Sequence, residues 1–354
     1  MSTILTVLVA VLVFGFLIFT HELGHFLAAR AFGVKVYEFS IGMGPKLAWY
    51  DSKKSGIRYK LCMFPFGGYV SMAEEGKDDA ALSEDPQALS NQKPWKRFII
   101  MAAGGVVNLI IGVVLMFAVV VSSQLGSTVV AGFPEEIRNE EVFTGDYGLQ
   151  SDDTVVSIGG KRVHTSMELD YEILRNGIEP LEVVVLRDGE YVTLNVTFPT
   201  SVTTGQIVGE RDFSLYEEPK IFSSVIKHTF WRSVCTVRMV WESLFDLVTG
   251  RFGVEAVSGP IGITSTVGEA VSYGFVPLLY MVSIISINLG IVNLFPLPAL
   301  DGGRLVFVLI EMIRRKPVPR ELEAKIHGIG MILLLLLAVL IMFKDIRTIF
   351  FASK

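Results

Sequence analysis

The run Thr3-Ile-Leu-Thr-Val-Leu-Val-Ala-Val-Leu-Val-Phe-Gly-Phe-Leu-Ile-Phe-Thr-His-Glu-Leu-Gly-His25 joins an uncharged apolar segment directly to a group of ionisable residues. A helix that crosses a bilayer needs roughly 20 predominantly apolar residues. Residues 3–20 carry no charge, and we expect the helix to continue to about Ala29. We expect a spanning helix and not a cleaved signal peptide, because the run lacks a basic leader and a small-residue cleavage site.

The last five residues of this run, His21-Glu22-Leu23-Gly24-His25, form the HExxH pattern. Residues four apart lie on one face of a helix, so both imidazoles can bind one metal ion while Glu22 stands beside them. Two unrelated histidines and a stray glutamate are the alternative. Ionisable residues in a membrane span are costly and mark functional sites by default, which favours a metal site.

Two histidines leave a catalytic zinc short of one protein ligand. The best candidate is Asp301, which follows Asn293-Leu-Phe-Pro-Leu-Pro-Ala-Leu300 at the end of a later apolar run. Pro296 and Pro298 break the helix there, and irregular backbone at membrane depth is tolerated where it lines a cavity. We expect the other three histidines at the surface or in packing contacts: His164, His228 and His327.

Two alternatives for this site stay open. Asp301 can cap a new helix at Gly302-Gly303, a role that can coexist with ligation. Two histidines and one carboxylate can also hold iron as a facial triad. The glutamate built into the helical HExxH pattern favours one zinc ion per chain, with Glu22 as the general base.

The composition is that of a membrane protein. Of the 354 residues, 51% are hydrophobic and 19% are charged, whereas soluble chains carry about a quarter charged residues. Three further apolar runs cover residues 98–123, 273–300 and 328–343. The predicted fold class is an α-helical multi-pass membrane protein with about four transmembrane helices, an inserted β-rich PDZ-like domain and a membrane-associated β-hairpin.

Charge sets the expected orientation, since cytoplasmic loops carry an excess of Lys and Arg. The loops at residues 30–97 and 314–325 are basic, whereas residues 124–220 hold 18 Asp and Glu against 7 Lys and Arg. We therefore expect the acidic section and both termini outside, and the HExxH site toward the cytoplasmic side. The net charge of −5, with no basic patch interleaved with aromatics, predicts no nucleic-acid partner.

The acidic section is predicted to be rich in strands. Residues 181–187 and 190–197 alternate on either side of Asp188-Gly189, which is a hairpin signal. Residues 148–163 resemble the core of a PDZ domain, with 167–176 as its helix, although Asp152-Asp153 replaces the usual Gly-Asp pair. The amphipathic stretch at 220–252 predicts a helix on the membrane surface or one packed on the PDZ-like domain.

The paired motifs HELGH and Asn293-xx-Pro-x-Pro-x-Leu-Asp301-Gly resemble the signatures of the bacterial site-2 proteases, the RseP-type intramembrane zinc metalloproteases. Four more segments resemble the family's: Phe39–Pro45, Pro65–Val70, Met101–Asn108 and Ser258–Ile263. The resemblance implies that His21, His25 and Asp301 bind zinc and that Glu22 acts as base. It also implies regulated intramembrane proteolysis in a bacterial cell membrane.

Four sections follow from these observations. They are a first membrane half (1–123), an extracytoplasmic PDZ-like domain (124–200), an amphipathic connecting segment (201–272) and a second membrane half (273–354).

Residues 59–71 predict how substrate meets the site. Their alternation before Gly67-Gly68 favours a strand edge that re-enters the membrane and pairs with extended substrate; a plain cytoplasmic hairpin is the alternative. Asn293 either hydrogen-bonds that substrate, as the resemblance suggests, or satisfies a carbonyl freed by the prolines.

The expected partners are the lipid bilayer and single-span membrane proteins already trimmed by another protease, such as anti-sigma factors or signal-peptide remnants. The PDZ-like domain would read substrate C-termini or act as a size filter. The rival functions are a catalytically silent membrane adaptor and a zinc transporter. The intact motifs argue against the adaptor, and the apolar spans argue against the transporter. Oligomeric state is left open.

Overall fold

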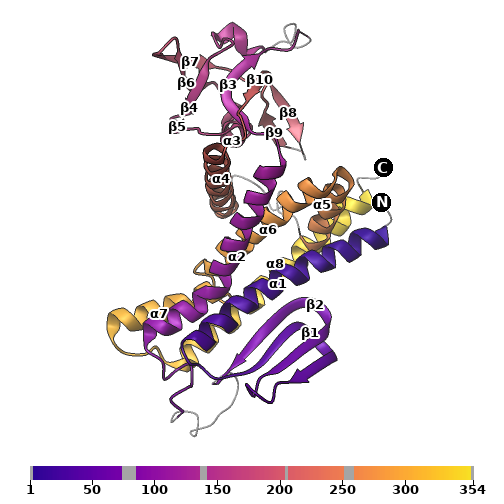
Figure 1. Cartoon of the computed structure of the whole chain (residues 1–354), viewed down its shortest axis with the longest axis vertical. Coiled ribbons are helices and arrows are strands. Elements are labelled where there is room, and N and C mark those ends of the chain that lie inside the picture. Colours follow the sequence, from indigo (N-terminus) through magenta and orange to yellow (C-terminus); the bar gives the residue numbers. More distant parts are fainter. Residues whose placement is uncertain (1–2, 74–84, 136–141, 204–205, 251–258, 352–354) are drawn as a thin grey trace. The chain divides into compact units, whose positions relative to one another are not determined.

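The computed structural model describes residues 3–73, 85–135, 142–203, 206–250 and 259–351. The chain divides into two compact units, one formed by Met1–Leu115 with Val240–Lys354 and the other by Met116–Met239. The first unit is helical with one small sheet, and the second is rich in strands (Figure 1). Residues 204–205 and 251–258 of the expected connecting segment, including Ser258, lie outside the described residues.

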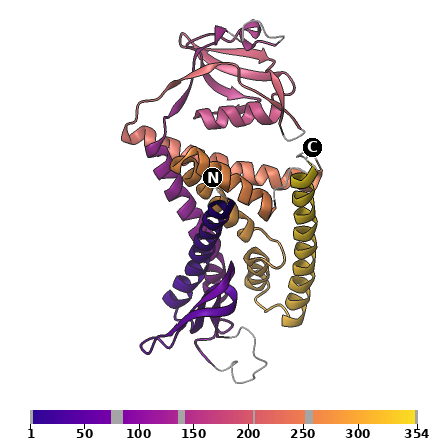
Figure 2. The ribbon, with the colours of Figure 1, turned by 90° about the vertical axis from the view of Figure 1, so that its right-hand side faces the viewer.

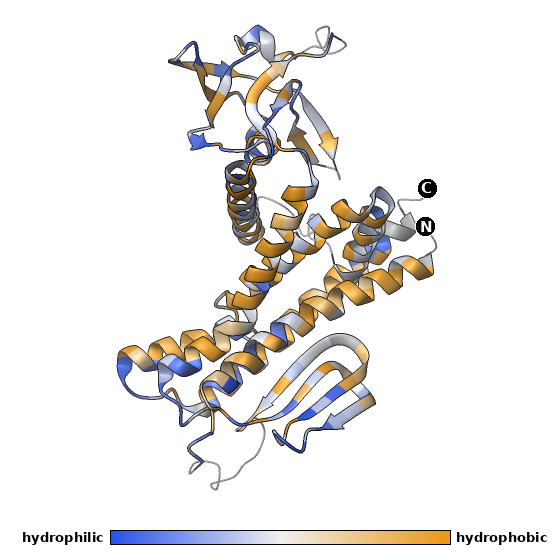
Figure 3. Ribbon diagram, viewed as in Figure 1, coloured by the Kyte–Doolittle hydropathy of each residue, from blue (hydrophilic) through white to orange (hydrophobic). Residues whose placement is uncertain are grey.

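Four helices are long and apolar enough to cross a membrane, as the sequence predicts. The candidate spans are Ile4–Ala31, Pro94–Ser122, Phe275–Leu294 and Glu321–Arg347. They belong to α1 (Thr3–Ala31), α2 (Pro94–Ser122), α6 (Phe275–Leu294) and α8 (Arg320–Phe351). Figure 3 shows the ribbons of α1 and α2 as largely hydrophobic, with a few hydrophilic turns.

The third span is shorter than the predicted run to residue 300. α6 ends at Leu294, and α7 (Asp301–Arg314) starts a new helix directly at the candidate ligand. Proline lacks a backbone N–H and clashes with the preceding turn, so Pro296 and Pro298 prevent α6 from continuing. A further helix, α5 (Pro260–Tyr273), precedes α6, and the apolar pattern did not predict it separately.

Polar contacts join α1, α2 and α6 inside the apolar core. Thr20 Oγ1 donates to Asn108 Oδ1 at 2.9 Å, and Ser286 Oγ donates to the Asn108 carbonyl at 2.8 Å. Ser283 Oγ donates to the carbonyl of Gly112 at 2.7 Å. In lipid, such interhelical hydrogen bonds hold helices together where the hydrophobic effect cannot.

The small sheet packs beside α1 (Figure 1). It consists of β1 (Val36–Asp51) and β2 (Arg58–Met72), two long strands that pair with each other in three stretches. Residues 58–61 of β2 pair with residues 48–51 and also with residues 38–41, and residues 68–72 pair with residues 36–41 from the other side. Apolar side chains of α1 and the sheet share one core that includes Phe26, Phe39 and Val70.

The second unit contains a sheet in the order β10-β3-β4-β6-β7, with β5 pairing β4 and with β8-β9 as a separate pair. The strands are β3 (Gly126–Gly132), β4 (Thr154–Ile158), β5 (Lys161–Arg162), β6 (Leu181–Arg187), β7 (Glu190–Val196), β8 (Thr200–Thr203), β9 (Gln206–Gly209) and β10 (Ser214–Glu217). The predicted hairpin is confirmed, because β6 pairs with β7 around Asp188 and Gly189, which have φ of 50° and 86°. The predicted helix is α3 (Ser166–Asn176), and Leu169 and Ile173 enter the core.

The amphipathic stretch forms α4 (Phe222–Thr249). Its first part packs on α3: Arg238 Nη2 lies 2.7 Å from Glu172 Oε1, and the Trp231 ring stacks on His164 with centroids 3.5 Å apart. Large apolar side chains on α4 stay exposed at helical spacing: Phe222, Ile226, Phe230, Val234, Val237, Trp241 and Phe245. The helix therefore packs on the β-rich unit and also presents an apolar stripe.

Candidate metal centre

Three potential metal ligands from opposite ends of the chain meet in the helical unit. His21, His25 and Asp301 are the one group of this kind found among the described residues. Asp301 Oδ2 lies 3.1 Å from His21 Nε2 and 3.2 Å from His25 Nε2, and the two Nε2 atoms are 3.3 Å apart. The two imidazoles come from neighbouring turns of α1, and the carboxylate comes from the first residue of α7.

These separations are equal to or slightly shorter than those around a tetrahedral zinc ion. Zinc bonds of roughly 2.0–2.2 Å at tetrahedral angles place ligand atoms about 3.3–3.6 Å apart. His25 Nδ1 lies 2.8 Å from the carbonyl oxygen of Ile100, an arrangement in which Nδ1–H donates and the Nε2 lone pair faces the other two residues. Metal-binding histidines commonly donate their second ring N–H in this way. The donor set of two imidazoles and one carboxylate therefore fits zinc.

Gly104 of α2 makes room for both imidazoles. A Cβ atom at this position would lie 2.3 Å from His25 Nε2 and 2.7 Å from His21 Cε1. Any larger residue would therefore displace the atom that faces Asp301. The sequence pattern did not identify Gly104, because its role depends on α2 lying against α1.

Glu22 lies where the sheet meets α1. A Cβ atom at Gly68 would lie 2.8 Å from Glu22 Cγ, so the β2 backbone passes directly over the Glu22 side chain. Gly67, the preceding residue, has φ of 86°, which favours glycine. The segment 68–72 thus lies between the candidate base and residues 36–41 of β1.

Asn293 lies in the last turn of α6, two residues before the break that leads to Asp301. Its side chain is half-buried, and its amide makes no hydrogen bond within the described part of the chain. Among the described residues, no carbonyl accepts a hydrogen bond from Asn293, and its contact with substrate stays a prediction.

Asp301 does not act as a helix cap. The N-cap of α7 is Leu300, and no side-chain cap hydrogen bond is present there. The Asp301 carboxylate approaches the two imidazoles instead, so the capping alternative is wrong.

Two of the three other histidines have packing roles. His164 stacks on Trp231, and His228 is fully buried 3.0 Å from Glu218 Oε2. His327 is different, because its Nδ1 accepts a hydrogen bond from the backbone N–H of Ala299, two residues before Asp301. Only a structure could reveal this link between α8 and the metal centre.

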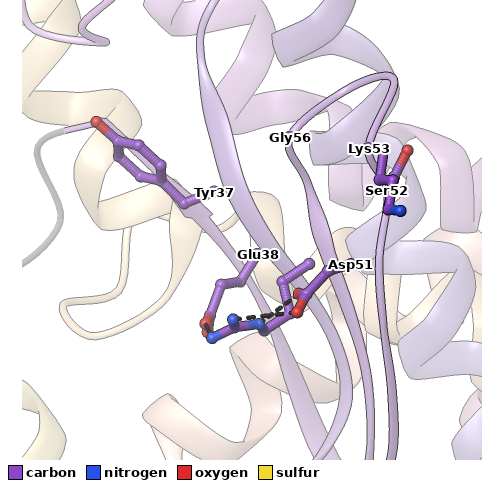
Figure 4. Close-up of a pocket in the computed structure, with 7 residues that line it drawn as sticks. Tyr37, Glu38, Asp51, Ser52, Lys53 and Gly56 are labelled. Atoms are coloured by element: carbon purple, nitrogen blue, oxygen red, sulfur yellow. Dashed lines mark hydrogen bonds and ion pairs between the residues drawn. The ribbon is translucent and has the colours of Figure 1, made fainter.

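Two cavities lie on the small sheet. A polar one of about 340 Å³ is lined by Tyr37, Glu38, Asp51, Ser52, Lys53, Gly56 and Arg58. Figure 4 shows Glu38 and Asp51 pointing toward each other in it, and Arg58 bonds Asp51 with Nε–Oδ1 at 2.6 Å. Ion-paired side chains line this cavity, and none of the candidate ligands is among the residues that line it. An apolar groove of about 510 Å³ lies between α1 and the sheet, lined by side chains that include Phe19, Leu23 and Trp49.

Membrane-spanning helices that bring HExxH and a distant aspartate within bonding reach of one ion define an intramembrane metallopeptidase. Comparison with known proteins gives the same class. Residues 9–337 match Peptidase family M50, and the chain belongs to this family of site-2 proteases.

The relatives match over nearly their whole length. A Clostridium acetobutylicum protein described as a zinc metalloprotease is 32% identical over 96% of this chain and 97% of its own. Zinc metalloprotease RasP of Bacillus licheniformis is 28% identical over 98% of this chain and 99% of its own. The Regulator of sigma-W protease RasP of Bacillus subtilis is 28% identical with the same coverage. The chain is thus a zinc metalloprotease. This identification disfavours the two rival functions, a catalytically silent adaptor and a zinc transporter.

Proposed function

We propose that His21, His25 and Asp301 bind a single zinc ion and that Glu22 is the general base of peptide hydrolysis within the bilayer. The observation that carries this proposal is the convergence of three ligand atoms, 3.1–3.3 Å apart, from α1 and α7. Zinc in such a site supplies Lewis acidity and lowers the pKa of water toward neutrality. Glu22 takes the proton of the attacking water and passes it to the departing amine.

The substrates are single-span membrane proteins, which include anti-sigma factors and signal-peptide remnants already shortened by another protease. The name of the Bacillus subtilis relative, which refers to sigma-W, supports the first group. A transmembrane helix hides its peptide bonds in its own hydrogen bonds, so it must become extended before hydrolysis. The segment 68–72 supports this step, because it runs along Glu22 and can pair with an extended chain.

Asn293 orients the extended substrate by hydrogen-bonding its backbone. Its amide is unbonded within the described residues and lies close in sequence to Asp301. The sheet dips into the membrane from the cytoplasmic side, and the large exposed apolar side chains Leu47, Trp49 and Phe64 support this placement. The β-rich unit is a PDZ-like domain outside the cell membrane, where it filters substrates by size or reads their C-termini.

The substitution Glu22→Gln tests the proposed base. Gln keeps the size of the side chain but cannot take a proton, so the variant should retain zinc and lose cleavage of a transmembrane reporter in detergent, by at least about a hundredfold. Zinc content by mass spectrometry and reporter cleavage on gels measure the two effects. Continued cleavage by this variant would remove Glu22 from the proposed role.

The ligand set is tested separately. His21→Ala and Asp301→Ala should both lower zinc content, because each removes one of three protein ligands. His164→Ala, which removes a histidine of the β-rich unit, is the matched control and should keep full zinc. Full zinc in Asp301→Ala would mean that another residue supplies the third ligand.

A further inference from the structure

The backbone just before Asp301 is a strained turn. Leu300 N–H donates to the Leu297 carbonyl at 3.3 Å, with Pro298 and Ala299 between them. Ala299 has φ of 75°. Proline followed by a residue with positive φ is the pattern of a type II turn, whose third position usually requires glycine. Alanine in this conformation is strained and persists only where its surroundings hold it.

His327 of α8 holds this turn. The Ala299 N–H donates to His327 Nδ1 at 2.9 Å. Because Nδ1 is the acceptor, the ring proton is on Nε2, and that atom is buried with no hydrogen-bond partner among the described residues. The only hydrogen bond of this imidazole in the described chain therefore goes to the turn.

The turn approaches α7 and α8 closely, and an apolar cavity of about 250 Å³ lies beside it. A Cβ atom at Gly330 of α8 would lie 2.3 Å from Pro298 Cβ, and a Cβ at Gly303 of α7 would lie 2.5 Å from the Leu297 carbonyl oxygen. Most of α8 is exposed, and its ribbon runs as one long helix in Figure 2. Besides the turn, α8 contacts the start of α5, where Asp345 Oδ2 accepts a hydrogen bond from the Gly262 N–H at 2.9 Å.

We propose that His327 is a positioning residue for the metal centre, which fixes the Leu297–Leu300 turn and thereby holds the Asp301 carboxylate at the two imidazoles. This inference rests on the proposed role of Asp301 as a ligand. His327 touches neither substrate nor metal, and it acts only through the backbone of Ala299.

Two substitutions of the same chemistry test the hydrogen bond. In His327→Asn the amide oxygen occupies the place of Nδ1 and accepts from Ala299, whereas in His327→Gln the amide is one carbon too far. The Gln variant should bind zinc about 10-fold to 100-fold more weakly, as is usual when an outer partner of a metal ligand is lost. The Asn variant should bind zinc nearly as tightly as the original chain. Competition with a chromogenic chelator in detergent measures these affinities.

Relief of the backbone strain provides an independent test. Glycine adopts positive φ without cost, so Ala299→Gly should restore most of the zinc affinity of His327→Gln. A general packing defect around His327 would not be repaired by this change, because Ala299→Gly adds no packing atoms and relieves only the positive φ. Melting temperatures of the zinc-free variants, measured in parallel, separate a loss of folding from a loss of positioning.

Equal zinc affinity in the Asn and Gln variants would overturn the proposal, as would a failure of Ala299→Gly to restore binding. Asp301→Ala distinguishes this failure from failure of the proposed function. If it loses zinc while His327→Gln keeps it, the ligand set stands and only the positioning role falls.

Discussion

Gly104 has no side chain, yet the arrangement of the candidate metal ligands depends on it. The two imidazoles occupy the space where a Cβ atom would stand, at 2.3 Å from His25 Nε2. A contact this short cannot be relieved by a flexible side chain, because both histidines are held on one helix and His25 is also bonded to Ile100.

Gly104→Ala should therefore lower zinc affinity by about 10-fold or more, since it moves the ligands themselves. Gly112→Ala is the matched control on the same helix. Its Cβ would lie 2.5 Å from Ile287 Cγ1, and Ile287 is not one of the candidate ligands. Both variants should lose some thermal stability, and only Gly104→Ala should lose zinc. Equal zinc affinity in the two variants would contradict this account.

The candidate ligands were predictable from sequence, whereas the residues that support them were not. His21 and His25 follow from helical spacing, and Asp301 follows from the cost of a carboxylate at the end of an apolar run. The contributions of Gly104 and His327 depend on which helices become neighbours, and no local pattern records this. His327 was predicted to have a surface or packing role, and the structure instead links it to Ala299.

At the level of elements, apolar runs predicted the spans well and their ends less well. One apolar run from residue 273 to residue 300 contains both α6 and the turn that leads into α7. Hydropathy does not distinguish helix from irregular backbone, and only the two prolines marked the change. The short helix α5 was also missed. Most of its residues lie in the polar stretch that was expected to connect the two halves, and hydropathy does not mark where a helix begins there.

The N-terminal part of α4 contains a pH-sensitive contact. Burial lowers the pKa of His228 below its ordinary value, despite the hydrogen bond with Glu218 that raises it. In the unfolded chain the histidine has an ordinary pKa of about 6.5, so as pH falls the unfolded chain binds more protons than the folded one. The contact between His228 and its surroundings therefore stabilises the folded state fully at pH above about 6.5, and this stabilisation decreases as the pH falls below that value.

Hydrogen exchange in the first half of α4, corrected for intrinsic rates, should accelerate between pH 7.5 and pH 5.5. His228→Gln can still donate to Glu218 but does not titrate, so its exchange should change little over the same range. Lys227 and Arg232, which also carry charge near His228, are unchanged in both chains. The same acceleration in the Gln variant would rule out His228 as the cause.

At the level of the whole molecule, the orientation in the membrane is a prediction from charge alone, and labelling can test it. Cys62 and Cys235 are both buried, and burial raises the pKa of the Cys235 thiol to about 11, so the native chain should react little. Tyr191 is 71% exposed in the β-rich unit, and Ser55 is exposed on the small sheet.

A membrane-impermeant maleimide should label Tyr191→Cys in intact cells, because the acidic section is predicted to face outside. It should label Ser55→Cys only after the cells are permeabilised. The parent chain supplies the background signal. Labelling of Ser55→Cys in intact cells would reverse the predicted orientation.

The hydrogen bonds from Thr20 to Asn108 and from Ser286 to the Asn108 carbonyl involve no metal ion. We therefore expect α1, α2 and α6 to stay in register with or without a bound zinc ion. Removal of zinc should then leave the helices in place, and activity should return when zinc is added back.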